Sequence, residues 1–161
     1  MTNAAGRERS TEAARLIKGS REKIYRAFLD PVALATWLPP GTMTGRIHSF
    51  DGREGGGFEM SLTYQAPAHR PPGKTTEDTD TFRVRFVELE PCSRIVQAVE
   101  FETSEPALSG EMRMTITLNE RGDGIEVRIV HENIPPGVRL EDNEVGTAQS
   151  LDQLAAFVEA Q

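Results

Sequence analysis

One segment, Arg15–Pro40, constrains the fold of this chain more than any other part of its sequence. Its letters, RLIKGSREKIYRAFLDPVALATWLPP, predict the end of a strand over residues 13–18, an amphipathic helix, a tight break and a second short helix. Ser20 suits the N-cap of the first helix, because its hydroxyl can accept a hydrogen bond from a free amide of the first turn. Asp30 and Pro31 end this helix and begin the next, since the residue before proline avoids the α region and proline fits the first helical position.

The middle of the chain alternates between apolar and polar residues with a period of two. Runs of this kind start at Phe58, Phe82, Ile95, Met112 and Ile125. Such alternation is typical of antiparallel strands that have one buried and one solvated face. We therefore expect an antiparallel sheet between the two short helices and the end of the chain.

Residues 141–160 predict a long closing helix. One line along it carries, at spacings of three or four residues, Asn143, Thr147, Leu151, Leu154 and Val158. The apolar part of this line should pack on the sheet, while Asn143 and Thr147 should point toward the interior near one end. This order of elements favours an α+β fold, in which a curved sheet grips a long helix and encloses a cavity.

The composition suits one globular domain. The chain has 161 residues, of which 37% are hydrophobic and 27% are charged. We expect residues 1–10 to form a disordered tail and residues 11–161 to form that domain. The net charge of -7 disfavours nucleic acid and anionic membranes as partners, because both are negatively charged. Cys92 is the only cysteine, and no apolar run resembles a signal peptide or a membrane span, which predicts a cytoplasmic protein.

Two connecting segments are rich in proline or glycine. The loop 65–80, QAPAHRPPGKTTEDTD, is long and polar, and it is either a lid over a binding site or a simple insertion. The segment Asp51–Gly57, DGREGGG, lacks the Lys-Ser/Thr pair of a phosphate-binding loop and lies between two strands rather than before a helix. It therefore predicts a hairpin with a β-bulge.

His131 lies at the end of the last expected strand, where the parity of Ile125 and Val127 turns it toward the interior. Two interpretations are open: a histidine that contacts a ligand or transfers protons, and a histidine hydrogen-bonded inside the fold. The spacing of His48 and His69 does not suit a metal site, and the chain contains no HExxH or CxxC motif. With no Gly-x-Ser-x-Gly motif either, the sequence assigns no catalytic residue, no metal and no cofactor.

Four stretches of the sequence carry a resemblance to a known family. They are IKGSREKIYRAFLDPVALATWLPP, FDGREGGGFEM, DTFRVRFVELEPCSRIVQAVEFE and VRIVHENIPPGVRLEDNEVGTAQSLDQLAAFVE. Together they make residues 13–159 resemble the bacterial homologues of the activator of heat-shock-protein-90 ATPase, which are members of the START-like (SRPBCC) superfamily. The resemblance implies a helix-grip fold, with about seven antiparallel strands, two short helices after the first strand, and a long carboxy-terminal helix across the concave face.

A sheet wrapped on a single helix often leaves unfilled volume, and ligand pockets are mostly apolar with a few polar groups. We therefore expect a small hydrophobic molecule as the ligand. The side chains expected to line its cavity are Trp37, Phe58, Met60, Tyr64, Phe82, Phe86, Phe101, Met112, Met114, His131, Asn143, Thr147 and Leu151. The polar groups among them are Tyr64, His131, Asn143 and Thr147.

Two further functions stay open. One is a cyclase- or hydrolase-like enzyme that uses His131 and Tyr64, since the same superfamily contains polyketide aromatases and cyclases. The other is a protein-interaction module of co-chaperone type, with a chaperone partner bound on the outer face of the sheet, although the resemblance itself does not imply chaperone activity. Small domains of this kind are often homodimers, but the sequence specifies no interface.

Overall fold

The computed structural model describes residues 9–64 and 78–161. The predicted tail 1–10 and the predicted loop 65–80, with His69, therefore lie largely outside the described residues. In chain order, the described elements are β1 (Thr11–Ile17), α2 (Arg21–Phe28), α3 (Pro31–Trp37), β2 (Thr44–Asp51), β3 (Gly57–Thr63), β4 (Thr79–Glu90), β5 (Arg94–Phe101), the short 3-10 helix η1 (Pro106–Leu108), β6 (Met112–Arg121), β7 (Gly124–Glu132) and α4 (Leu140–Glu159).

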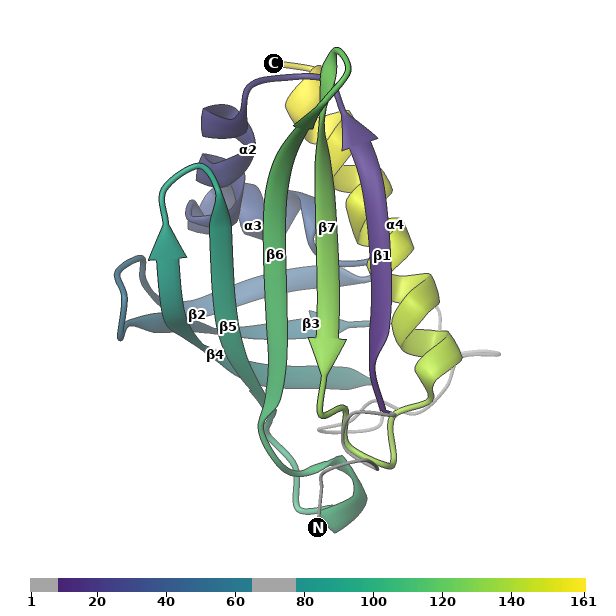
Figure 1. Cartoon of the computed structure of the whole chain (residues 1–161). Helices are drawn as coiled ribbons and strands as arrows, with labels where there is room; N and C mark the ends of the chain where they lie inside the picture. The colour runs from purple at the N-terminus through teal and green to yellow at the C-terminus, as the bar shows by residue number, and fades with distance from the viewer. Residues whose placement is uncertain (1–8, 65–77) are drawn as a thin grey trace, which may run out of the picture.

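The strands form one antiparallel sheet in the order β1-β7-β6-β5-β4-β3-β2. Figure 1 shows how strongly this sheet curves, because β1, β6 and β7 run lengthwise while β2, β3 and β4 cross behind them. The long helix α4 lies along β1, and α2 and α3 pack against α4 and against β6 and β2. The α+β helix-grip fold predicted from the sequence is confirmed, and its interior lies between the sheet and α4.

Both short helices begin at the caps predicted from the sequence. The hydroxyl of Ser20 accepts a hydrogen bond from the amide of Lys23 at 3.1 Å. Oδ1 of Asp30 accepts from the amides of Val32 and Ala33 at 2.9 and 3.3 Å. Each cap satisfies amides that have no partner within the helix, and this makes the helix start a local property of the sequence.

The predicted boundaries of the outer elements differ slightly from those observed. The strand predicted over 13–18 begins earlier, at Thr11, because Thr11 pairs with His131 of β7. That contact joins distant parts of the chain, so a local pattern does not show it. The closing helix predicted over 141–160 spans Leu140–Glu159. None of the described helices has an apolar stretch long enough to cross a bilayer.

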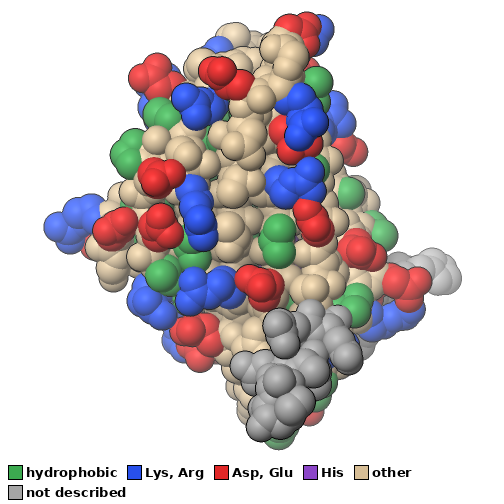
Figure 2. Space-filling model, viewed as in Figure 1, with side chains coloured by type: hydrophobic (Ala, Val, Ile, Leu, Met, Phe, Trp, Pro, Cys, Tyr) green, Lys and Arg blue, Asp and Glu red, His purple; other side chains and the backbone are tan. Residues whose placement is uncertain are grey.

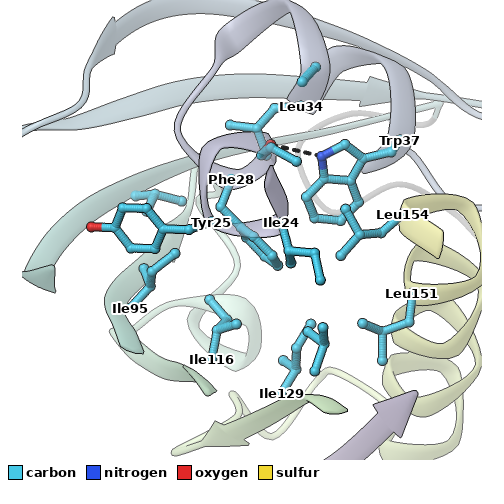
Figure 3. Packing of buried hydrophobic residues seen from close by; sticks show 14 of the residues in the cluster. Ile24, Tyr25, Phe28, Leu34, Trp37, Ile95, Ile116, Ile129, Leu151 and Leu154 are labelled. Atoms are coloured by element: carbon cyan, nitrogen blue, oxygen red, sulfur yellow. Dashed lines mark hydrogen bonds between the residues drawn. The ribbon is translucent and has the colours of Figure 1, made fainter. Parts of the chain in front are cut away.

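The interior beneath α2 and α3 is a well-buried apolar core (Figure 3). Its side chains come from α2, α3, α4 and the sheet, and they include Ile24, Phe28, Leu34, Trp37, Ile95, Ile116, Ile129, Leu151 and Leu154. Trp37 packs edge-on against Phe28, with 4.9 Å between the ring centroids, and its Nε1 donates to the carbonyl oxygen of Ala27 at 2.9 Å. Removing this apolar surface from water stabilises this end of the fold.

The segment Asp51–Gly57 connects β2 and β3 as a hairpin, as its glycines predict. Gly57 has no room for a side chain, because a Cβ there would lie 1.8 Å from the carbonyl oxygen of Val84 on β4. Gly55 adopts a positive φ of 84°, a left-handed conformation that glycine tolerates best. The irregularity of β2 lies outside this segment, at His48, where the register with β3 shifts.

Candidate functional site

A row of side chains, here named the interior row, crosses the inner face of the sheet from β1 to β4. Its members are register partners on successive strands, in the order Thr11, His131, Met114, Gln97 and Phe86. Opposed residues of an antiparallel pair point to the same face of a sheet, and Phe86 is fully buried in the core. The whole row therefore faces the interior, as the parity of His131 predicts.

His131 is the unusual member of the interior row. Only 7% of its surface is exposed, and its Nδ1 has no hydrogen-bond partner among the described residues. Burial disfavours the charged ring and lowers the pKa of His131 from its usual 6.5 to about 4, so the imidazole is neutral near pH 7. Buried polar atoms normally have a partner, but Nδ1 has none in the described part of the chain and is itself enclosed, so a water or ligand atom reaches it only when a neighbouring side chain moves. Of the two interpretations of His131, a histidine hydrogen-bonded inside the fold is therefore not what the structure shows at Nδ1.

The predicted polar residues of α4 lie beside the start of the interior row. Oγ1 of Thr11 donates a hydrogen bond to Oδ1 of Asn143 at 2.5 Å, which ties β1 to the first turn of α4. Oγ1 of Thr147 donates to the backbone carbonyl oxygen of Asn143 at 2.7 Å, a bond within the helix. Both hydroxyls therefore have partners, whereas no described residue pairs with Nδ1 of the neighbouring His131.

Gln97 and Thr11 are interior residues that the sequence patterns did not single out. Gln97 is buried next to Met114, and none of the hydrogen bonds among the described residues holds its side-chain amide. The sequence does contain a sign of its role: Gln97 is the one polar residue on the strand face that also carries Ile95, Val99 and Phe101. Thr11 gave no such signal, because the strand was expected to begin at Ala13.

Met114 shows that accessible space reaches the interior row. It lies between His131 and Gln97, which are both buried, yet it is itself only half-buried. Phe101 at the end of β5 and Leu62 on β3 are likewise half-buried against the core. A methionine side chain adapts to irregular shapes, so the partly exposed Met114 suits contact with an apolar molecule.

The predicted cavity residues fall into two groups by burial. Those buried in the core are Trp37, Phe58, Met60, Phe82, Phe86, Met112 and Leu151. The half-buried ones are Tyr64, Phe101, Met114, Asn143 and Thr147, with His131 buried next to Met114. A ligand can contact the second group more readily, because other parts of the protein already cover the first.

Two hollows open on the outside of the described structure. One, of about 460 Å³, lies over Gly55–Gly57 and beside Arg83 and Arg85. These arginines pair with Glu100 and Glu111 at 4.0 and 3.4 Å, and Glu59 adds a further acidic side chain to the lining. The other, of about 610 Å³, lies between α3 and β2. Neither hollow includes a member of the interior row.

The outer face of β1, β6 and β7 is a mixed charged surface. Figure 2 shows Lys or Arg side by side with Asp or Glu over this face, and hydrophobic side chains only scattered between them. Arg128 accounts for part of the pattern, since it pairs with both Glu12 and Glu126. Exposed ion pairs contribute little to stability, and scattered apolar side chains do not mark a docking site.

Comparison with known proteins relates this geometry to a family. The family model described as Activator of Hsp90 ATPase homolog 1-like protein matches residues 18–159. Protein CV1439 from Chromobacterium violaceum is 36% identical, with a TM-score of 0.82 over 94% of this chain and 98% of that chain. Two more distant structures share the fold: protein Mll3558 from Rhizobium loti (24% identity, TM-score 0.71, 92% of this chain and 95% of that chain) and protein Ms6760 from Mycobacterium smegmatis (14% identity, TM-score 0.73, 94% and 91%). No curated protein matches the chain.

Proposed function

The chain belongs to the family of Activator of Hsp90 ATPase homolog 1-like proteins, and we propose that it binds a small hydrophobic molecule between the sheet and α4. The observation that carries the proposal is the interior row, where half-buried Met114 lies next to His131, whose Nδ1 no described residue pairs with. An apolar surface with a few fixed polar groups is the usual composition of a small-molecule site. The ligand would enter at the half-buried end of the interior, where Phe101 also keeps accessible surface.

The same site is poorly suited to acid–base catalysis. A general base works best when its pKa lies near the operating pH, and burial lowers the pKa of His131 to about 4. Tyr64, its expected partner in a cyclase-like enzyme, follows β3, with β4, β5 and β6 between it and β7 in the sheet. We therefore propose binding without a chemical step.

A co-chaperone role, which the family description suggests, would use an outer surface instead of the interior row. The outer face of β1, β6 and β7 carries charges of both signs and scattered hydrophobic groups (Figure 2). Nothing on the described part of this face favours binding of a chaperone over binding of a small molecule in the interior. The rate of ATP hydrolysis by Hsp90, with and without this protein, separates the two functions. We expect an unchanged rate, and a stimulated rate would favour the co-chaperone role.

Titration with N-phenyl-1-naphthylamine, an uncharged probe that brightens in apolar surroundings, tests the binding proposal. We expect saturable fluorescence enhancement with the wild type. Met114→Trp should fill the space beside the interior row and weaken binding by about tenfold or more, which corresponds to about 1.4 kcal/mol.

Arg113→Trp is the matched control, because it places the same indole on the exposed, opposite face of β6 and should leave the affinity unchanged. Far-UV circular dichroism shows whether both variants fold. Absence of binding by the wild type, or equal weakening by the two variants, would contradict the proposal.

A further inference from the structure

We infer that the bound molecule carries an uncharged hydrogen-bonding group, such as a phenolic hydroxyl, which pairs with Nδ1 of His131. This inference rests on the proposed function and adds a polar requirement to the apolar character of the ligand. Two features carry it: a hydrogen-bonding atom on β7 without a partner among the described residues, and an interior row with no cationic member.

Nδ1 of His131 is the polar atom that a ligand can satisfy. The residue is more than nine-tenths buried, and no described residue bonds to this nitrogen. Leaving a buried polar atom unpaired costs free energy, so a ligand that supplies the missing hydrogen bond is favoured over one that does not. The neighbouring hydroxyl of Thr11 already donates its hydrogen to Asn143, whereas Nδ1 of His131 makes no bond with any described residue.

The interior row also indicates where the apolar body of the ligand lies. From His131 on β7, the next members are half-buried Met114 on β6 and then Gln97 on β5. Neighbouring strands are about 4.8 Å apart, so His131 and Gln97 are roughly 10 Å apart along the row. A body of two fused rings with its hydroxyl at His131 would therefore extend over Met114 toward Gln97.

The charges around the row favour an uncharged polar group. None of the members of the interior row is Lys or Arg, and the buried imidazole is neutral near pH 7. A carboxylate ligand on this row would lose its hydration, and none of the row's own members offers it a cationic partner, which is costly.

Three probes that share one ring system test this inference: naphthalene, 1-naphthol and 1-naphthoate, each measured by displacement of N-phenyl-1-naphthylamine. In the wild type, 1-naphthol should bind about fivefold more tightly than naphthalene, the gain expected from one net hydrogen bond, and 1-naphthoate should bind most weakly. His131→Leu should bring the ratio of the naphthol and naphthalene affinities close to one. His48→Leu, at an exposed histidine on the outer face, should preserve the wild-type ratio.

The outcomes separate this inference from the proposed function. Equal affinities for naphthalene and 1-naphthol, tighter binding of 1-naphthoate, or a preference for 1-naphthol that survives in His131→Leu would overturn the inference while the proposed function stands. Failure of every probe to bind would overturn both. A wild-type measurement covers the case in which His131→Leu does not fold: the nitrogen-15 resonance of Nδ1 of His131 should move with 1-naphthol and not with naphthalene. An unmoved resonance under saturating 1-naphthol would also overturn the inference.

Discussion

Acid should destabilise this protein through His131. In the folded chain, burial holds the pKa of His131 at about 4, whereas an exposed histidine titrates near 6.5. Between these values the unfolded state binds a proton that the folded state does not, so the free energy of unfolding falls as the pH falls through this range. At about 1.4 kcal/mol per pH unit, the loss reaches about 3 kcal/mol near pH 4.

Urea unfolding of the wild type and of His131→Leu, at several pH values from about 7.5 to about 4, measures this loss. The variant lacks the titrating ring, so its free energy of unfolding should fall less than that of the wild type, by about 3 kcal/mol over the range. Carboxylates that both proteins share cancel in the comparison. His48→Leu removes an exposed histidine and should behave like the wild type. A constant difference between the wild type and His131→Leu at all pH values would refute the reasoning.

Two further predictions concern the packing of the fold, and urea unfolding at neutral pH measures both. Gly57→Ala should lower the free energy of unfolding by at least about 3 kcal/mol, because the new Cβ would meet the carbonyl oxygen of Val84 at 1.8 Å. Gly55→Ala is the matched control: Gly55 has a positive φ but open space around it, so the loss should be about 1 kcal/mol. Equal losses in the two variants would contradict the steric argument. Trp37→Phe should cost about 2 kcal/mol, since it leaves a void and removes the 2.9 Å bond to Ala27, and an unchanged midpoint would count against that packing.

Local features made most of the fold predictable from the sequence. Ser20 and Asp30 bond to the amides of their own first turns, so a short stretch of sequence is enough to place both helices. The alternation of apolar residues likewise reports which face of each strand is buried. The predicted inward direction of His131 is confirmed for this reason.

The composition of the candidate site depends on contacts between distant parts of the chain. Thr11 enters the interior row only because β1 pairs with β7, and the register of that pairing is not written in either strand alone. Periodicity marks Trp37 and Met114 alike as inward-facing, but it does not report that Trp37 is enclosed while Met114 keeps accessible surface. Nor could it show that Nδ1 of His131 lacks a partner among the described residues, because this depends on every neighbouring element.

The measurement that tests the binding site most directly is an NMR titration of the protein with N-phenyl-1-naphthylamine, with the methionine methyl groups labelled with carbon-13. If the ligand lies on the interior row, the methyl resonance of Met114 should shift saturably, while the indole N–H of Trp37, enclosed in the core and bonded to Ala27, should stay in place. Saturable binding that leaves the Met114 resonance unmoved, or that moves the Trp37 resonance instead, would contradict the assignment of the ligand to this row.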